Sequence, residues 1–485
     1  MKVAIAVLAA AVVAVPAADA YRNPTPGAAV ALQIPGMHRA KVRRNIVYQP
    51  ALRLRMDVYR PRHARGRLPA VLLGGPPGFD KDTGQKIGWA QLIAASGMAA
   101  VAFDIRSDDR LQSPRSPSRD VRSAIAFVRA HAARLGIDAG RLCTLGFSIG
   151  TAPWHLWATM RDPKPWLRCN VVYYGPLDFQ SPAFPIDRSQ AEEFSALTYL
   201  RRFPGRIPPM LVLKAGRDAN EGINESIDRF QAAATDLHAD VRVVTYPEAA
   251  HGFDLGPRTV RSRAIVRQTL HFLRARLARP LPVDEECATK AERASALRFF
   301  AADDTPLVGV VVGGGPHGVV LAHGQNGDLC EWLPYARELA ARGLRVLAYD
   351  SRPGIRVDLD MAAAIEALRR TGSEDVVAGG SSAGAIAALI GSSSLASAPA
   401  AVVSLSAPAS YGPLNALQAV RRLQAPVFFA ASEEDEPFVS DARALYAASA
   451  SPDRRLEILP GAAHGSAMFQ DSAFRARVTA FIAGH

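Results

Sequence analysis

The chain has 485 residues, which is too long for one ordinary hydrophobic core and indicates two or three domains. Hydrophobic residues make up 49% of it and charged residues 21%, a balance typical of soluble globular proteins that excludes a disordered chain and a bundle of membrane helices. The net charge of +12 would suit an anionic partner, but the arginines are scattered and not interleaved with aromatic residues, so we predict no nucleic-acid binding.

The first twenty residues have the layout of a secretory signal peptide. Lys2 precedes an apolar run, and the segment ends in the small-x-small triplet Ala18-Asp19-Ala20. An N-terminal membrane anchor is the alternative, but the run is short for a bilayer span and contains Pro16. We therefore expect cleavage after Ala20, export to the periplasm or the medium, and no stable membrane insertion.

Residues 45 to 280 alternate short β-branched runs with longer helical patterns, which predicts a mostly parallel sheet flanked by helices. The predicted strands are "RLRMDVY", "PAVLLGG", "MAAVAFD", "RLCTLGF", "CNVVYYG", "MLVLKAG" and "VRVVTYP". Residues 21 to 44 form an N-terminal extension in this interpretation. Between 281 and 294 the periodicity lapses, which predicts a linker.

Residues 295 to 485 repeat the same plan, with strands "ALRFFAA", "PLVGVVVG", "GVVLAHG", "RVLAYD", "DVVAGGS", "AVVSLSA", "PVFFAAS" and "RLEILPG". The predicted fold class is therefore α/β, with two tandem domains. Gly313, Gly315 and Gly318 fit the spacing of a dinucleotide-binding turn, but that turn needs a helix after it and a strand follows here. We interpret these glycines as a hairpin turn and predict no nucleotide cofactor.

Four cysteines give no CxxC spacing, so we predict no metal site. Cys143 and Cys169 lie near the starts of successive predicted strands and could form a disulfide after export, which would leave Cys287 and Cys330 as a second pair. Buried free thiols are the alternative, because free cysteine is itself a common core residue.

The stretch "RLCTLGFSIGTAPW" places Ser148 between a strand and a helix, with Gly146 and Gly150 two residues away on either side. A sharp strand-to-helix turn that exposes a serine needs small residues at these offsets. A serine needs a base and an orienting acid to become a nucleophile, and both are expected later in the chain. Asp218 and His251 each follow a predicted strand, so all three residues are expected at the carboxyl edge of the sheet.

These residues resemble the serine α/β-hydrolases, in particular the dienelactone hydrolase and prolyl oligopeptidase branches. The segments "KAGRDANEGINESIDRF" and "YPEAAHGFD" carry the resemblance, which covers residues 45 to 280. It implies that Ser148 is the nucleophile, Asp218 the orienting acid and His251 the base. Dienelactone hydrolase itself has cysteine at the position of Ser148, so the resemblance does not imply a lactone substrate.

The oxyanion of the reaction needs backbone N–H donors from two places. The residue after the nucleophile, Ile149, supplies the first. The loop after the second predicted strand reads Leu73 to Gly78 and is similar to an H-G-G-P loop with leucine in place of histidine. Its two prolines have no N–H to donate, so Gly75 is the expected second donor.

The second half contains the same order of motifs. In "AGGSSAGAI" only Ser382 has glycines at both required offsets, and a flexible Gly/Ser loop is the alternative interpretation. The acid is Glu433, Glu434 or Asp435, of which we favour Asp435, and the base is His464. The segment "VVLAHGQNGD" resembles the H-G oxyanion loop of the same superfamily, which implies Gln325 and Ala383 as N–H donors.

We predict an exported serine hydrolase that cleaves a small-molecule or polymer-linked ester through an acyl-enzyme, without cofactor or metal. An ester is preferred to a peptide because no propeller-like domain precedes the first catalytic domain. A prolyl oligopeptidase-type peptidase is one alternative, and a protein that binds an envelope polymer or lipid without turnover is another. The long segment 176 to 209 predicts a larger lid over the first site than over the second, and a surface loop without a role in substrate binding is the alternative.

Overall fold

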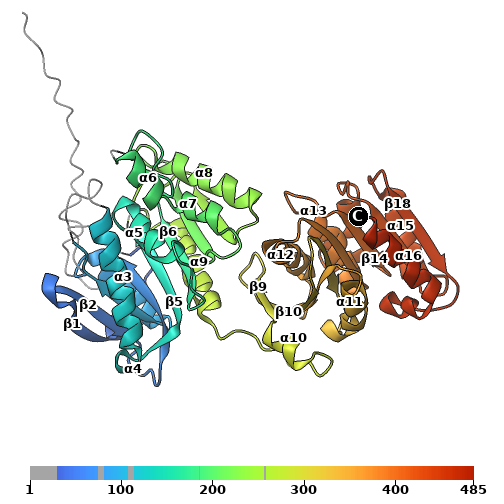
Figure 1. Cartoon of the computed structure of the whole chain (residues 1–485), viewed down its shortest axis with the longest axis horizontal. Coiled ribbons are helices and arrows are strands. Elements are labelled where there is room, and N and C mark those ends of the chain that lie inside the picture. The colour runs from blue at the N-terminus through green and yellow to red at the C-terminus, as the bar shows by residue number, and fades with distance from the viewer. Residues whose placement is uncertain (1–29, 75–80, 107–113, 185, 256–257, 284) are drawn as a thin grey trace, which may run out of the picture. The chain divides into compact units, whose positions relative to one another are not determined.

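The chain divides into two compact units, Met1–Ala278 and Arg279–His485, which appear at the two ends of the colour range in Figure 1. The structure is a computed structural model, and it describes residues 30–74, 81–106, 114–184, 186–255, 258–283 and 285–485, with the backbone only for 149–152. The predicted signal peptide, residues 1 to 20, lies outside the described residues.

The first unit is built on an eight-stranded sheet with the order β1-β2-β4-β3-β5-β6-β7-β8. β1 and β2 pair antiparallel, as do β2 and β4, and every other neighbouring pair is parallel. The strands are β1 (Lys41–Gln49), β2 (Leu54–Arg60), β3 (Leu68–Gly74), β4 (Ala99–Phe103), β5 (Ile137–Phe147), β6 (Leu167–Tyr173), β7 (Met210–Ala215) and β8 (Val241–Tyr246).

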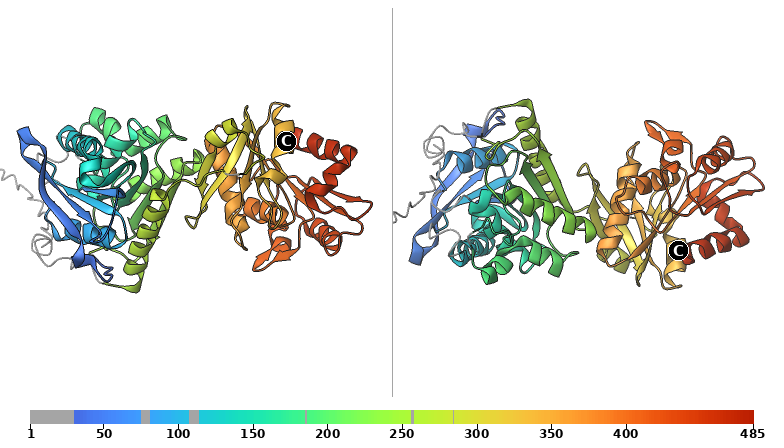
Figure 2. Two further views of the ribbon diagram at one scale, coloured as in Figure 1. Left: turned by 90° about the horizontal axis from the view of Figure 1, so that it is seen from below. Right: turned by 90° about the horizontal axis from the view of Figure 1, so that it is seen from above.

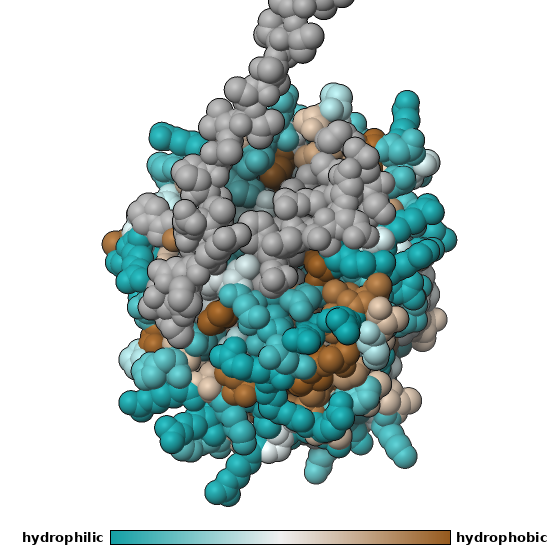
Figure 3. Space-filling model, turned by 90° about the vertical axis from the view of Figure 1, so that its left-hand side faces the viewer, coloured by the Kyte–Doolittle hydropathy of each residue, from teal (hydrophilic) through white to brown (hydrophobic). Residues whose placement is uncertain are grey.

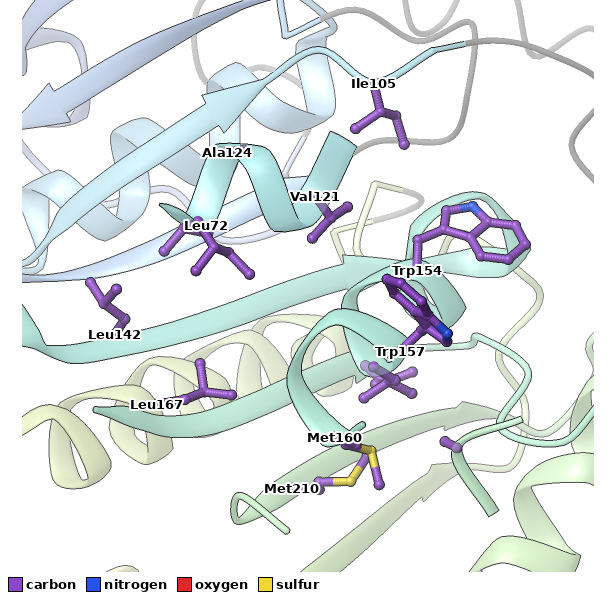
Figure 4. Packing of buried hydrophobic residues seen from close by; sticks show 14 of the residues in the cluster. Leu72, Ile105, Val121, Ala124, Leu142, Trp154, Trp157, Met160, Leu167 and Met210 are labelled. Atoms are coloured by element: carbon purple, nitrogen blue, oxygen red, sulfur yellow. The ribbon is translucent and has the colours of Figure 1, made fainter. Parts of the chain in front are cut away.

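Helices cover both faces of this sheet, as Figure 2 shows. One face carries α3 (Arg115–Ala130), α4 (Ala132–Leu135), α5 (Ser148–Met160), α6 (Arg188–Phe194), α7 (Ala196–Arg202) and α8 (Ile223–Asp236), and the other carries α2 (Gly84–Ala95) and α9 (Val260–Leu277). Successive strand residues point to opposite faces, so Leu72 packs in the core under α3 and α5, whereas Leu73 packs under α2 and α9. Figure 4 shows the first of these two cores.

The first unit begins earlier than the sequence predicted. The expected start at residue 45 falls inside β1, and Val30 and Leu32 are already buried in the core beside α2. Most residues of β1 are exposed or half-buried because it is an edge strand, so it lacks the apolar alternation of a half-buried strand. Figure 3 shows this side of the molecule, where hydrophilic residues cover much of the described surface and hydrophobic ones gather in patches.

The second unit repeats the same topology. Its sheet order is β9-β10-β12-β11-β13-β14-β17-β18, with antiparallel pairing only at β9, β10 and β12. The strands are β9 (Leu297–Phe300), β10 (Pro306–Gly313), β11 (His317–Ala322), β12 (Arg345–Asp350), β13 (Asp375–Ser381), β14 (Ala401–Leu405), β17 (Val427–Ser432) and β18 (Arg454–Leu459). The prediction of two tandem α/β domains is confirmed.

Helices again cover both faces of the second sheet. One core contains α12 (Val357–Arg370), α13 (Ala383–Ser393), α14 (Ala416–Val420) and α15 (Phe438–Ala448), and the other contains α11 (Leu333–Ala340) and α16 (Ser472–Ala483). The short strands β15 (Ser410–Tyr411) and β16 (Leu414–Asn415) form a separate hairpin. In the part of the chain that the structure describes, no helix is long and apolar enough to cross a membrane.

The glycines of "GGGPHG" do not form the hairpin turn that the sequence suggested. β10 ends at Gly313 and β11 begins at His317, but β12 lies between these two strands in the sheet. The segment is therefore a tight connection between strands that are not neighbours. A strand does follow the glycines, and that was the observation that argued against a dinucleotide-binding turn.

The predicted linker, 281 to 294, belongs structurally to the second unit. Val283 and Ala288 are buried in its core, and α10 (Lys290–Ala294) begins with a capping box. A disulfide joins Cys287 to Cys330, and another joins Cys143 to Cys169 across β5 and β6. Both pairings that the sequence suggested are therefore present, and the alternative of free thiols was wrong.

Candidate active site

Both predicted nucleophiles occupy strained turns between a strand and a helix. Ser148 follows β5, begins α5 and has a φ angle of 55°. Ser382 follows β13, precedes α13 and has a φ angle of 51°. A positive φ is uncommon for a residue with a side chain and occurs where the surrounding structure imposes it, often at functional sites. The two serines therefore share one backbone device.

The requirement for small residues around this turn can be seen at the second site. A Cβ atom placed on Gly380 would lie 2.4 Å from the carbonyl carbon of Gly384. One placed on Gly384 would lie 2.2 Å from the carbonyl oxygen of Ala322 in β11. Both distances are far inside van der Waals contact, so only glycine fits at these two offsets.

The first site brings the three predicted residues into one hydrogen-bonded chain. His251 Nε2 lies 2.8 Å from Ser148 Oγ, and His251 Nδ1 lies 2.7 Å from Asp218 Oδ2. Asp218 follows β7 and His251 follows β8, so the three side chains come from three strand ends at one edge of the sheet. This is the nucleophile, base and acid geometry that activates a serine hydroxyl.

Asp218 is held as a carboxylate. Its side chain is fully buried, and burial raises its pKa, but the hydrogen bond and charge of His251 outweigh that effect. The backbone N–H and the side-chain amide of Asn220 also donate to Asp218 Oδ1, at 2.9 and 2.8 Å. The net result is a pKa below the usual value, so the residue stays ionised opposite His251.

Two residues that the sequence analysis did not single out support His251. The ring of Tyr174 packs against the imidazole of His251, with ring centroids 4.4 Å apart. The Tyr174 hydroxyl donates to Asp254, which is fully buried and also accepts hydrogen bonds from Gln85 Nε2 and Trp89 Nε1. Burial raises the pKa of Asp254. The only signal in the sequence was the position of Asp254, three residues after His251.

The second site pairs its predicted acid and base. His464 Nδ1 lies 2.9 Å from both carboxylate oxygens of Asp435. Glu433 and Glu434 are exposed, whereas Asp435 is buried beside His464. The structure therefore places Asp435, and not either glutamate, next to the histidine. Ser406, at the end of β14, donates to Asp435 Oδ2 at 2.7 Å.

The nucleophile of the second site is not coupled to its base in this structure. Among the described residues, no hydrogen bond joins Ser382 Oγ to His464, in contrast to the first site. A carboxylate lies nearby instead: Glu331 accepts the hydroxyl of the adjacent Ser381 and the backbone N–H of Gly324, the latter at 2.8 Å. Glu331 was not singled out in the sequence, where nothing distinguished it from other exposed-loop acids.

The predicted oxyanion donors are only partly described. Ile149 and Ala383 each occupy the first turn of the helix after the nucleophile, where backbone N–H groups have no partner within the helix. Gly75 lies outside the described residues. Gln325 is exposed in the loop after β11, and the neighbouring Gly324 N–H already donates to Glu331.

Within the described ranges, no group of three or more His, Cys, Asp or Glu side chains is arranged to hold a metal ion.

The chain is similar in sequence to known esterases and to related proteins. The BD-FAE family model matches residues 56–168. The esterase LipC of Mycobacterium tuberculosis is 27% identical over 286 residues, which cover 50% of this chain and 69% of that protein. A putative carboxymethylenebutenolidase of Salmonella typhi is 30% identical over 142 residues, 28% of this chain. The chain spans 46% of the length of that relative.

Solved structures of esterases are also similar to this chain. The thermophilic esterase Est2 of Thermogutta terrifontis is 21% identical, covers 49% of this chain and 93% of its own, and has a TM-score of 0.40. A mutant of the esterase rPPE is 18% identical, covers 52% of this chain and 88% of its own, and has a TM-score of 0.42.

Each unit thus has a sheet with helices on both faces and a strained serine turn, and the chain is similar in sequence to an esterase and to a putative carboxymethylenebutenolidase.

Proposed function

We propose that the protein is an exported serine carboxylesterase with one active site in each unit. The hydrogen-bonded chain of Ser148, His251 and Asp218 is the observation that carries the proposal. The names of the matched relatives, an esterase and a carboxymethylenebutenolidase, support cleavage of an ester-type bond.

In the proposed mechanism, Ser148 Oγ attacks the carbonyl carbon of an ester while His251 Nε2 takes the hydroxyl proton. Asp218 accepts from Nδ1 and stabilises the imidazolium that forms. The N–H of Ile149 donates to the oxyanion, and Gly75 is the proposed second donor. His251 then gives its proton to the departing alkoxide, which leaves as an alcohol. Water, deprotonated by His251, adds to the acyl-enzyme and releases the carboxylic acid.

The second unit is proposed to run the same reaction through Ser382, His464 and Asp435, with Gln325 and Ala383 as N–H donors. The missing contact between Ser382 and His464 means that a side chain must rotate before the serine is deprotonated. The Glu331 carboxylate also lies close to the turn that carries Ser382. We therefore expect the second serine to react more slowly than the first, and more slowly still with anionic esters.

Export is proposed from the N-terminal segment and supported by the disulfides. Both pairs of cysteines are oxidised, and disulfides persist chiefly outside the reducing cytoplasm. N-terminal sequencing of the secreted protein tests this proposal, and a mature chain that still begins at Met1 would contradict it.

The test of the esterase proposal is covalent labelling with a fluorophosphonate, followed by peptide mass mapping. We expect the label on Ser148 first and on Ser382 later, with each signal abolished by the matching serine-to-alanine variant. The single variants then assign hydrolysis of short p-nitrophenyl esters to each site. An absence of label on Ser148 would refute the esterase proposal and favour a binding protein. An absence on Ser382 alone would make the second unit a scaffold.

A further inference from the structure

A basic pocket lies on the first unit away from the catalytic residues. It has a volume of about 430 Å³ and is formed by α3, the C-terminal half of α5 and the segment that connects α5 to β6. We define it by its four cationic side chains and two tryptophans, namely Arg122, Arg129, Arg161, Lys164, Trp157 and Trp166. Figure 4 shows Trp157 on α5 together with residues of α3.

The charge of this basic pocket is strongly positive. Asp162 is the one acidic side chain among its lining residues, and it pairs with Lys164 at 2.8 Å. Arg161 lies 3.6 Å from Glu193, which also pairs with Arg115. In the part of the chain that the structure describes, no carboxylate lies within ion-pair distance of Arg122 or Arg129. These two exposed guanidinium groups are therefore available to an anionic ligand.

The tryptophans hold the arginines in place. Arg122 and Arg161 both lie over the ring of Trp157, at 5.6 and 5.1 Å from its centroid, and Arg129 lies 4.3 Å from the centroid of Trp166. A guanidinium stacked on an aromatic face keeps its N–H edge directed outward and has less side-chain freedom to lose when it binds. The pocket is thus preorganised for an anion.

The ring contacts also indicate what does not bind there. Because guanidinium groups lie against the two indole rings, those faces are not open for a nucleobase or a neutral sugar to stack on. The indole N–H of Trp157 is buried, so the hydrogen-bond donors that line the pocket are those of the arginines and Lys164. Ile125 and Ala126 add an apolar surface between the cations.

The spacing of the arginines suits a chain of anionic groups better than one small ion. Arg122 and Arg129 are seven residues apart on α3, which corresponds to about 10 Å along the helix. One carboxylate reaches one of these guanidinium groups, whereas successive acidic units of a polymer reach both. The apolar residues between them can contact the C–H surface of a sugar ring.

We propose that the basic pocket binds an acidic polysaccharide through the carboxylates of successive sugar units. The arginine fork pairs with a carboxylate through two parallel hydrogen bonds, which gives both affinity and orientation. The pocket lies 9 to 13 residues beyond Ser148 along α5, about 14 to 20 Å away, so a bound polymer leaves the active site free. In a step that rests on the proposed esterase function, such a polymer delivers ester groups to Ser148.

The test is calorimetric titration of the mature chain with a tetramer of galacturonic acid at about 0.15 M salt, where long-range attraction is largely screened. The double variant Arg122→Gln with Arg129→Gln is expected to bind at least tenfold more weakly, and Arg129→Gln alone to give an intermediate loss. The control is Arg421→Gln with Arg422→Gln, which removes the same charge from exposed arginines of the second unit and is expected to bind like the parent.

Each outcome of this titration supports or overturns the proposal. Equal binding by the double variant and the control would overturn it, as would tighter binding of polyphosphate or of a neutral galactose tetramer than of the acidic sugar. Hydrolysis of a short p-nitrophenyl ester should be the same in all variants, which also shows that they fold. If that ester is not cleaved by any of them, the esterase proposal fails while the binding result stands.

Discussion

Replacing Asp218 by asparagine is expected to inactivate the first site by stabilising the wrong tautomer of His251, without changing the shape of the site. Two N–H groups of Asn220 point at Asp218 Oδ1, so the new amide will place its oxygen there. Its NH2 group then faces His251 Nδ1 and forces that nitrogen to be the acceptor. The proton of the imidazole moves to Nε2, which faces Ser148 Oγ and can no longer take its proton.

The loss follows from the step that is blocked. A wrong tautomer removes general-base catalysis but leaves the backbone oxyanion donors intact, so we expect kcat to fall about 10³ to 10⁴-fold. That corresponds to about 4 to 5.5 kcal/mol of transition-state stabilisation. KM should change little because Asp218 is buried behind His251 and does not reach the substrate.

The assay is hydrolysis of a short p-nitrophenyl ester in a Ser382→Ala background, so that only the first site contributes. Asn220→Ala is the matched control: it removes one donor from Asp218 but keeps the carboxylate, and we expect a loss of less than tenfold. A kcat for Asp218→Asn within tenfold of the parent would show that the hydrogen-bonded chain is not the catalytic device.

Two further predictions concern stability. Burial, and after it the neighbouring Glu285 carboxylate, raise the pKa of Asp350 to about 7. The folded second unit therefore holds a proton that the unfolded chain releases near pH 4. As a result, the free energy of unfolding of this unit falls as pH rises from about 4 to 7. Asp350→Asn mimics the protonated acid, so at pH 8 it should raise the free energy of unfolding of this unit by about 2 kcal/mol. This is less than the full pKa shift implies, because Asp350 is partly exposed and its titration depends on that of Glu285. At pH 4 the same variant should give little gain. Hydrogen exchange of β12 and β13 peptides, compared at equal pH, measures both values, and an equal gain at the two pH values would be inconsistent with this reasoning. Tyr174→Phe keeps the ring against His251 but removes one donor from buried Asp254. We expect the free energy of unfolding of the first unit, measured by hydrogen exchange of β6 and α9, to fall by about 2 kcal/mol with kcat nearly unchanged. A tenfold lower kcat would mean that the hydroxyl itself takes part in catalysis.

Much of the fold was predictable because buried parallel strands are continuous apolar runs bounded by turns. β10, β12 and β13 have the bounds that the sequence predicted. β1 was missed because an exposed edge strand such as "KVRRNIVYQ" shows charges where a buried strand shows apolar residues. The "GGGPHG" turn was misread because glycine spacing indicates a tight turn but does not tell which strand will lie between its two ends.

In the candidate sites, too, some features could be predicted from the sequence and others depend on tertiary packing. Ser382 could be separated from Ser381 by its glycine offsets, because steric exclusion leaves a mark in the sequence. The choice among Glu433, Glu434 and Asp435 depends on which carboxyl group turns toward His464, and that is decided by packing. Tyr174 could not have been found, since an aromatic residue at a strand end is far more often part of a core.

The two disulfides differ in how easily a reductant can reach them. Cys143 and Cys169 are fully buried, whereas Cys287 and Cys330 are half-buried, and Cys330 directly precedes Glu331. A mild thiol should therefore open the second bridge while the first stays closed. The loop that holds Gly324 and Ser381 through Glu331 would then lose its covalent anchor. A short exposure to a mild thiol would thus perturb one of two similar sites in the intact, unmutated chain.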